Sequence, residues 1–265
     1  MSVLTITQQG STAVLTMNRP QQRNAMDLEL RAAFEVAIAQ VRDDPAVRSV
    51  VLTGAGGHFC AGADVRTIQA GASGPRDIYE GRDRIRKLQH WFDDWVDLEK
   101  PVIAAVDGVC FGAGLSLALA ADFVLASPRA SFCAVFARLG YVPDMGAMYL
   151  LPRAVGLARA KELVFSARVV DATEAKAMGL VHTLCEGDVL QAALTLAARF
   201  DHAPTGALGI AKAVMNRSFE SSRDSVYEKE AMAQAMARES GFHQEAARRF
   251  LAKEEPLYQW PKNNA

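Results

Sequence analysis

The chain has 265 residues, of which half are hydrophobic and 22% are charged, and its formal net charge is −1. This is the composition of a globular protein that is long enough to bury a sizeable core, and it excludes a disordered chain. A net charge so near zero gives no general attraction to nucleic acid or to an anionic membrane surface, so neither is an expected partner. An anionic ligand would have to be held by local charges.

The cysteines and the first residues indicate a cytoplasmic protein. The four cysteines have neither metal-site nor disulfide-framework spacing: Cys60, Cys110, Cys133 and Cys185. Free thiols in a reducing compartment are therefore expected. Residues 1–5 lack a basic segment followed by an apolar run, so no secretion signal is expected. The apolar stretch 102–123 contains Asp107, Asp122 and several glycines, which favours a buried strand, turn and helix over a membrane span.

Strands and helices are predicted to alternate in the first half of the chain. Val3–Thr7 and Ala13–Met17 are short strands around a turn. Asp27–Val41 places its apolar residues on one helical face, with Asp27 as the N-cap. The other elements expected here are strands at Arg48–Thr53, Pro101–Val106 and Phe123–Ala126, helices at Arg76–Asp97 and Leu115–Ala120, and a glycine-rich turn at Gly108–Gly114.

Helical patterns dominate after Pro152, from Leu157 to Lys253. They are interrupted near Gly179, Gly187, Pro204 and Gly241. Strands and helices that alternate early, followed by a part in which helices dominate, predict an α/β core with a helical C-terminal part. The expected organisation is a core at residues 1–200 and a helical region at residues 201–265.

Two glycine-bearing turns are the candidate site. They span His58–Val65 and Asp107–Ser116, and each follows a buried strand and leads toward a helix. Small residues allow a ligand to approach the main chain, and N–H groups at the start of a helix point toward negative charge. Two such amides directed at one oxygen form an oxyanion hole. The glycines alone favour the alternative, which is a pair of tightly packed turns without catalytic function.

The chain resembles the crotonase, or enoyl-CoA hydratase/isomerase, family over nearly its whole length. The matching segments come in the family's order: Asn18–Pro20, Asn24–Met26, Val50–Gly54, Phe59–Asp64, Ala105–Gly108, Gly112–Gly114, Leu151–Gly156 and Ala175–Val181. No segment is decisive by itself, but the ordered set is specific. The resemblance implies a spiral of ββα units with a helical C-terminal region that forms a homotrimer or a dimer of trimers.

The resemblance also implies the roles of individual residues. The N–H groups of Ala63 and Ala113 would bind the thioester carbonyl of an acyl-CoA substrate. Coenzyme A would enter as part of that substrate, and no metal or redox cofactor would be needed. The residues expected around the CoA channel are Arg23, Ala25, Ala61, Asp64, Val65 and Gly112, with Arg23 near the phosphates and Asp64 bracing its turn. Phe250 and Lys253 resemble CoA-contacting residues that often come from a neighbouring subunit, although a core Phe and a solvated Lys are equal alternatives.

The sequence departs from the hydratases of this family at two positions. Those enzymes carry a glutamate where this chain has Ser116, and a second where it has Phe136. Hydration requires a water molecule activated between two acid/base groups, which a serine and a phenylalanine cannot supply. Ordinary hydratase activity is therefore not expected. Ser116 would contact the substrate or pack against its neighbours.

Another carboxylate, Asp144, lies where several branches of the family place a catalytic aspartate. The segment 132–144 resembles most the ring-epoxide isomerases of phenylacetate degradation. Desolvation by Phe136, Val142 and Met145 would raise the pKa of Asp144 and make it a better base. The alternative is that Asp144 is the N-cap of a helix that begins at Met145 or Gly146. Tyr141 is expected to shape the acyl pocket.

The sequence thus predicts an acyl-CoA isomerase that shifts a double bond, or rearranges a ring, through an enolate held in the oxyanion hole. Asp144 would remove a proton from C2 and return it at C4. Two alternatives stay open. One is an enoyl-CoA hydratase-like lyase with atypical catalytic residues, and the other is a CoA-thioester-binding protein without turnover.

Overall fold

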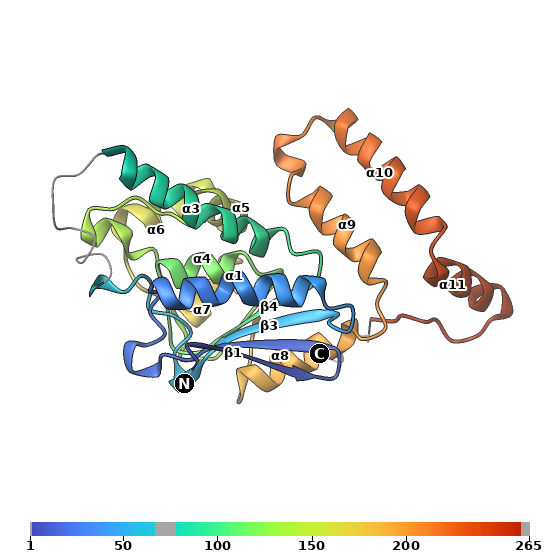
Figure 1. Ribbon diagram of the computed structural model, residues 1–265, viewed down its shortest axis with the longest axis horizontal. Helices are drawn as coiled ribbons and strands as arrows, with labels where there is room; N and C mark the ends of the chain where they lie inside the picture. Colours follow the sequence, from blue (N-terminus) through green and yellow to red (C-terminus); the bar gives the residue numbers. More distant parts are fainter. Residues whose placement is uncertain (1, 67–77, 261–265) are drawn as a thin grey trace.

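A computed structural model describes residues 2–66 and 78–260 of the chain (Figure 1). The main sheet has the strand order β1-β2-β3-β4-β6-β9. Its strands are β1 (Leu4–Gln9), β2 (Thr12–Met17), β3 (Ser49–Gly54), β4 (Val102–Val106), β6 (Phe123–Ala126) and β9 (Thr183–Leu184). β1 and β2 form an antiparallel hairpin, and from β2 onward each strand runs parallel to the next. Parallel neighbours need crossover connections, and helices provide most of them.

Successive residues of the central strands face two different cores. Val50 and Leu52 belong to the larger core, whereas Val51, between them, belongs to the smaller one. The larger core is covered by α1 (Leu28–Asp43), α3 (Ile78–Val96) and α4 (Ala113–Leu119), and the smaller by α8 (Val189–Ala197) on the opposite face (Figure 1). A strand that is buried on both faces reads as a continuous apolar run, which explains the sequence of β3 and β4.

The first predicted helix is confirmed. The Asp27 side chain accepts a hydrogen bond from the Leu30 N–H at 2.8 Å, which satisfies one of the unpaired donors of the first turn of α1. The face that the sequence predicted to be apolar is buried: Leu30, Phe34, Ala37, Ile38 and Val41. The helix expected at Arg76–Asp97 corresponds to α3, with residues 76 and 77 outside the described residues.

A second, three-stranded sheet was not predicted. It has the order β5-β7-β8, with β5 (Val109–Phe111), β7 (Ser131–Cys133) and β8 (Val170–Asp171). The expected glycine-rich turn at Gly108–Gly114 therefore contains a strand, because the three β-forming residues between its glycines pair with β7. A strand of the main sheet followed by a strand of the second sheet and then a helix is a ββα unit. β4, β5 and α4 form one such unit.

The remaining short elements connect these units. The 3₁₀ turns are η1 (Pro20–Gln22), η2 (Ala55–Gly57), η3 (Val135–Leu139), η4 (Ala198–Phe200) and η5 (Ser218–Glu220). The intervening helices are α5 (Ala147–Val155), α6 (Leu157–Ser166) and α7 (Ala172–Ala177). No helix within the described ranges is long and apolar enough to cross a membrane.

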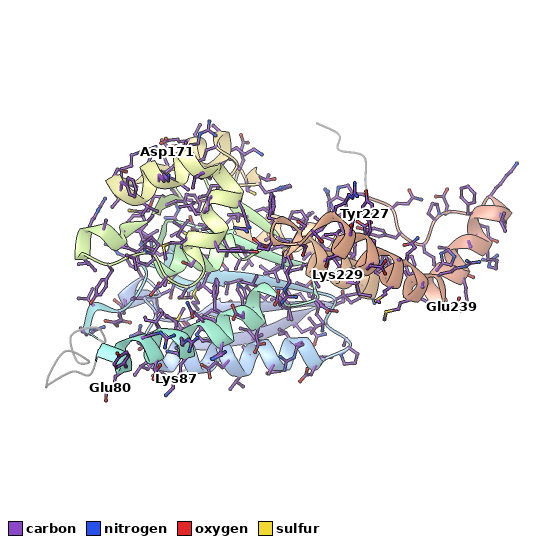
Figure 2. All side chains as sticks on the ribbon, turned by 90° about the horizontal axis from the view of Figure 1, so that it is seen from above. Glu80, Lys87, Asp171, Tyr227, Lys229 and Glu239 are labelled. Carbon is purple, nitrogen blue, oxygen red and sulfur yellow. The ribbon has the colours of Figure 1, made fainter. Side chains whose placement is uncertain are left out.

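The C-terminal helices extend away from the sheets. α9 (Thr205–Met215) leads to α10 (Arg223–Arg238), and α11 (Gly241–Ala252) follows (Figures 1 and 2). Every residue of α10 and α11 is at least partly exposed. The expected boundary at residue 200 falls at the end of η4, shortly before α9 begins.

Candidate active site

The first glycine turn is held against the segment before α1. The Met26 N–H donates to the Gly62 carbonyl at 2.7 Å, and the Asp64 N–H donates to the Met26 carbonyl at 2.8 Å. These two bonds form a parallel bridge between Met26 and Ala63, in which Met26 bonds to the residues on both sides of Ala63. The N–H of Ala63 itself therefore points away from Met26. Gly62 has a φ of +100°, which favours glycine and turns the chain toward Ala63.

The second glycine turn is built in the same way on β5. The Cys60 N–H donates to Val109 at 2.9 Å, and the Phe111 N–H donates back to Cys60 at 2.9 Å, which aligns the two turns. Gly112 has a φ of +53°, and α4 begins directly after it at Ala113. The Ala113 N–H is therefore one of the first-turn donors that an α-helix leaves without an internal partner.

The two turns are in contact. A β-carbon added to Gly62 would lie 3.7 Å from the Ala113 nitrogen, and one added to Gly112 would lie 3.6 Å from the Gly62 α-carbon. A β-carbon on Gly114 would lie 2.8 Å from that of Cys60, so glycine is required for this approach. Within residues 2–66 and 78–260, no backbone carbonyl accepts the N–H of Ala63 or Ala113. The junction thus offers two neighbouring backbone donors to a ligand oxygen.

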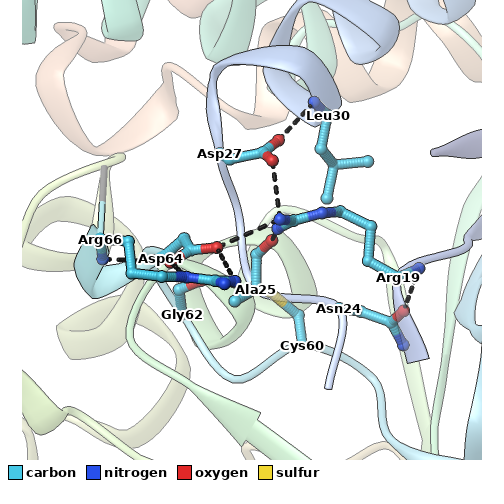
Figure 3. A network of polar contacts seen from close by, with 9 residues as sticks. All are labelled: Arg19, Asn24, Ala25, Asp27, Leu30, Cys60, Gly62, Asp64 and Arg66. Carbon is cyan, nitrogen blue, oxygen red and sulfur yellow. Dashed lines mark hydrogen bonds and ion pairs between the residues drawn. The ribbon is translucent and has the colours of Figure 1, made fainter. Parts of the chain in front are cut away.

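Asp64 braces the first turn through a charged network (Figure 3). Arg19 Nη2 lies 3.1 Å from Asp64 and 2.7 Å from Asp27, and Arg19 also donates to the Ala25 carbonyl. Arg66 reaches Asp64 with Nη2 at 3.1 Å and with its own N–H at 3.1 Å. Hydrogen bonds from Arg66 and then from Arg19 lower the pKa of Asp64 to about 2, against the opposing effect of burial. Asp64 therefore remains charged and paired, which suits a brace and not a base.

Sequence reasoning missed the bridging role of Arg19. Its side chain is largely buried and joins the loop before α1 to the turn that carries Ala63. Asn24 completes the same loop: its Oδ1 accepts from the Arg19 N–H, and its Nδ2 donates to the His58 carbonyl at 2.7 Å. An arginine and an asparagine in the family-like segments at 18–20 and 24–26 were the available indication.

Asp144 lies in the loop between η3 and α5. Burial raises its pKa, while a hydrogen bond with its own backbone has a smaller, opposite effect. Among the described residues, no other side chain hydrogen-bonds to its carboxylate or forms an ion pair with it. The alternative that Asp144 caps a helix is wrong, because α5 begins at Ala147 with Gly146 as its N-cap.

Ser116 and Phe136 border the second turn. Ser116 is completely buried, and its hydroxyl donates to the Asp144 carbonyl at 3.1 Å, with the Gly112 carbonyl 3.4 Å away. Phe136 is half-buried, and its ring lies 4.0 Å from the position of a β-carbon on Gly112. Neither position that carries a glutamate in the family's hydratases therefore supplies a carboxylate in this chain.

The other predicted residues lie in three places. Arg23, Ala25, Ala61 and Val65 belong to the segments around the first turn: Arg23 and Val65 are exposed, Ala25 is buried, and the Ala61 N–H donates to the Arg23 carbonyl at 2.9 Å. Tyr141 is exposed in the loop that carries Asp144, and its N–H donates to the Phe136 carbonyl at 3.1 Å. Phe250 and Lys253 are on or next to α11, which projects away from the sheets (Figure 1). The alternative of a core phenylalanine is wrong for Phe250, whose exposed fraction is 82%.

Comparison with known proteins identifies the class to which this fold and site belong. The enoyl-CoA hydratase/isomerase family model matches residues 7–261. The chain belongs to this family, the crotonases, whose members act on acyl-CoA thioesters. The crystal structure of an enoyl-CoA hydratase/isomerase from Cupriavidus metallidurans CH34 superposes with a TM-score of 0.93 at 40% identity, covering 100% of this chain and 99% of that one. The predicted α/β crotonase fold is thereby confirmed.

Two curated relatives carry different activity names. The 1,2-epoxyphenylacetyl-CoA isomerase of Escherichia coli K12 is 34% identical over 249 residues, which are 92% of this chain and 93% of the relative. A probable enoyl-CoA hydratase of Mycobacterium tuberculosis H37Rv is 40% identical over 203 residues, which are 77% of each chain. Family membership alone therefore does not choose between isomerase and hydratase.

Proposed function

We propose that this enzyme is an acyl-CoA isomerase that shifts a double bond, or rearranges a ring, through a thioester enolate. The observation that carries the proposal is the set of groups around the second glycine turn. Asp144 is the carboxylate-bearing residue of the loop whose backbone Ser116 binds, whereas Ser116 and Phe136 themselves occupy the positions of the two hydratase glutamates. One base can move a proton between two carbons, but water addition needs a second acid/base group.

The two backbone donors would stabilise the intermediate. The thioester oxygen binds between the N–H groups of Ala63 and Ala113. When a base breaks the C2–H bond, the electron pair is delocalised onto that oxygen, and the donors are already oriented toward it. Removal of one such donor typically raises the barrier by about 3–4 kcal/mol, which makes the hole the largest contribution to catalysis. With a 3-enoyl substrate, the proton returns at C4 and the double bond moves to C2–C3.

Asp144 fits the role of the base that carries this proton. Burial raises its pKa, and among the described residues no arginine or lysine pairs with it to oppose that effect. A carboxylate with a raised pKa accepts a carbon-bound proton more readily than an ordinary aspartate does. Asp64, which directly follows Ala63, lacks this property because two arginines hold its pKa at about 2.

Phe136 favours isomerisation over hydration. Its ring lies beside the second turn, where a hydratase of this family presents a carboxylate to water. An aromatic ring at this place neither orients nor activates a water molecule. The name of the E. coli relative, an epoxide isomerase, supports the same choice and suggests a ring-bearing acyl group.

The coenzyme A moiety would lie along the first turn. The Arg23 carbonyl accepts the Ala61 N–H, which places Arg23 beside the first turn. Because the residue is exposed, its side chain can reach an anionic phosphate near the channel entrance. Phe250 and Lys253 would contribute from a neighbouring copy in a homotrimer or a dimer of trimers. In that arrangement residues 1–200 form the catalytic core and residues 201–265 the assembly region.

A substrate panel tests the proposal. The enzyme is incubated separately with a 2-enoyl-CoA, a 3-enoyl-CoA and an aryl-epoxide CoA thioester, and products are identified by mass and absorbance. Isomerisation leaves the mass of the substrate unchanged, whereas hydration adds the mass of one water. A 2-enoyl substrate that gains water as the dominant reaction would instead support the hydratase alternative, which the M. tuberculosis relative favours. Tight binding without exchange of C2 protons for deuterium would indicate a CoA-binding protein without turnover.

A further inference from the structure

The loop that carries Asp144 has an unfavourable backbone conformation. Met145 has a φ of +45° and Gly146 a φ of +70°, so two consecutive residues are left-handed. For Met145, which is almost completely buried, this costs about 1–2 kcal/mol. Such conformations persist only where surrounding contacts hold them. No other described side chain hydrogen-bonds to the Asp144 carboxylate, so the backbone of the loop is the part of this residue that its neighbours hold.

Two donors bind the Asp144 carbonyl, and they have different origins. The Ala147 N–H, at 3.0 Å, belongs to the start of the following helix and moves with the loop. The Ser116 hydroxyl, at 3.1 Å, belongs to α4, the helix whose first residue is Ala113. Ser116 therefore connects the loop that carries Asp144 to α4, whose first residue supplies one of the two oxyanion donors.

The loop is also held from the side of α3. A β-carbon on Gly146 would lie 2.9 Å from Cε1 of Phe92, so this part of the loop packs tightly on that helix. Packing of this kind keeps the loop close to the core but does not connect it to the oxyanion hole. The Ser116 hydroxyl makes that connection, because its oxygen, which binds the Asp144 carbonyl, also lies 3.4 Å from the carbonyl of Gly112, the residue before Ala113.

We propose that Ser116 is a positioning residue that fixes the Asp144 carboxylate relative to the Ala113 N–H, and that it acts through the backbone and not through contact with the substrate. The inference rests on the proposed function, in which Asp144 is the base. Proton transfer depends steeply on geometry: a displacement of about 1 Å can reduce a rate by about 100-fold. One hydrogen bond that joins base and hole can therefore affect turnover more than stability.

The test compares Ser116→Ala and Ser116→Cys with the control Ser49→Ala. Ser49 is also completely buried, and its hydroxyl shares one hydrogen bond of 2.9 Å with Thr12, in the β2–β3 pair. Steady-state isomerisation of a 3-enoyl-CoA gives kcat and KM, and calorimetric titration with a saturated acyl-CoA gives the affinity. We expect Ser116→Ala to lower kcat about tenfold or more with KM and affinity within twofold. Ser116→Cys, which keeps a weak donor, should lie between Ala and the parent. Ser49→Ala should lose similar thermal stability and keep its kcat.

Three results would overturn the inference: an unchanged kcat in Ser116→Ala, a raised KM or weakened affinity with kcat intact, or an equal fall of kcat in Ser49→Ala. If Ser116→Ala does not fold, Ser116→Cys decides, and a parental kcat in that variant overturns the inference. Asp144→Asn separates this inference from the proposed function. If the asparagine variant turns over at the parental rate, the base itself is misassigned. If it is inactive while Ser116→Ala is fully active, only the positioning role fails.

Discussion

Gly62 and Ala113 meet at the junction of the two glycine turns, where a β-carbon on Gly62 would lie 3.7 Å from the Ala113 nitrogen. The same β-carbon would lie 3.1 Å from the Phe111 carbonyl oxygen. Gly62 follows β3 and Ala113 follows β5, so the contact joins residues that are 51 positions apart in sequence. The absence of a side chain at Gly62 leaves space for a ligand oxygen beside the Ala113 N–H.

Replacement of Gly62 by alanine should abolish most of the activity. The φ of +100° is unfavourable for alanine, and the new methyl group would lie beside the donor that the thioester oxygen needs. Loss of one oxyanion donor typically lowers kcat by about 10²–10³-fold, so a fall of at least 100-fold is expected. Steady-state kinetics with the best substrate of the panel measures it.

Gly187→Ala is the matched control. Gly187 also has a positive φ, +83°, but no atom beyond its chain neighbours lies within 4 Å of an added β-carbon. Both alanine variants should lose roughly 1–3 kcal/mol of unfolding free energy from backbone strain. Only Gly62→Ala should lose turnover when both are assayed well below their unfolding temperatures. Equal losses of activity would mean that strain, and not obstruction of the hole, is the cause.

Regular elements could be predicted from sequence because their determinants are local. The apolar face of α1 and its Asp27 cap lie within sixteen consecutive residues, and β6 has the bounds that were predicted for it. The strands β5 and β7 were missed because each has three residues and is defined by pairing with distant segments, β5 with β7 and β7 also with β8. No local pattern distinguishes such a segment from a glycine-rich turn.

The site could be predicted only in part for a similar reason. The two turns and Asp144 were found from glycine spacing and family resemblance. The contact between Gly62 and the second turn, and the bridge from Arg19 to Asp64, depend on how distant segments pack. The hydrogen bond from Ser116 to a backbone carbonyl of the Asp144 loop depends on the positive φ of Met145, which nothing in its sequence neighbourhood indicates.

Asp144→Asn should remove proton transfer and preserve binding. The amide keeps the shape of the side chain but cannot act as a base, and general-base contributions are typically about 10²–10⁴-fold in rate. We expect kcat for the 3-enoyl-CoA to fall by that range, while the Kd of a saturated acyl-CoA changes less than about threefold. Deuterium exchange at C2 in heavy water measures the same step without product formation. Turnover within about threefold of the parent would exclude Asp144 as the base.

The raised pKa of Asp144 also predicts two pH effects. The base must be ionised, so kcat/KM should rise with pH through a pKa that lies above the usual range for aspartate. Burial disfavours the charged form in the folded state, so this residue lowers the free energy of unfolding as pH rises through its folded pKa. Asp144→Asn should therefore be more stable than the parent at neutral pH and equal to it in strong acid, below the pKa of the unfolded chain. Denaturant titrations at several pH values measure the difference in free energy of unfolding between Asp144→Asn and the parent. If the variant's excess stability grew toward acidic pH, the pKa of Asp144 could not be raised.

Arg19→Met should destabilise the protein by about 2–4 kcal/mol, because it leaves Asp27 and the largely buried Asp64 without a partner they share. Arg66→Met is the control, since the Arg66 side chain is 71% exposed and solvent screens its ion pair with Asp64. The pKa of Asp64, about 2, lies below that of the unfolded chain. Its stabilisation is therefore fully present above the unfolded pKa and is lost as pH falls through the folded one. Arg66, which contributes more than Arg19 to the lowered pKa, is retained in Arg19→Met. The difference in free energy of unfolding between the parent and Arg19→Met should therefore shrink only in part toward pH 2, and a difference that is constant with pH would indicate lost packing alone.

The final prediction concerns assembly. Large apolar side chains remain exposed along the projecting helices: Met232, Met236, Phe250 and Leu251. Figures 1 and 2 show these helices away from the sheets, so their own chain does not cover them. Exposed apolar surface of this kind usually marks a contact with another subunit. We expect a trimer or a dimer of trimers in which α11 of one copy completes the CoA site of the next, so that assembly and ligand affinity are coupled.

Phe250→Glu should therefore weaken both subunit association and the affinity for acetyl-CoA. Light scattering across a dilution series, with and without acetyl-CoA, gives the association state, and calorimetric titration gives the affinity. The variant should dissociate at higher protein concentration than the parent and bind acetyl-CoA at least about tenfold more weakly. Val36→Glu is the control, because Val36 is also largely exposed but lies on α1, within the body of the fold. Acetyl-CoA should shift the parent toward the assembled state, since a ligand bound between two subunits stabilises their contact. A parent protein that is a monomer of 28.6 kDa at micromolar concentration and still binds acetyl-CoA normally would refute both the assembly and the shared site.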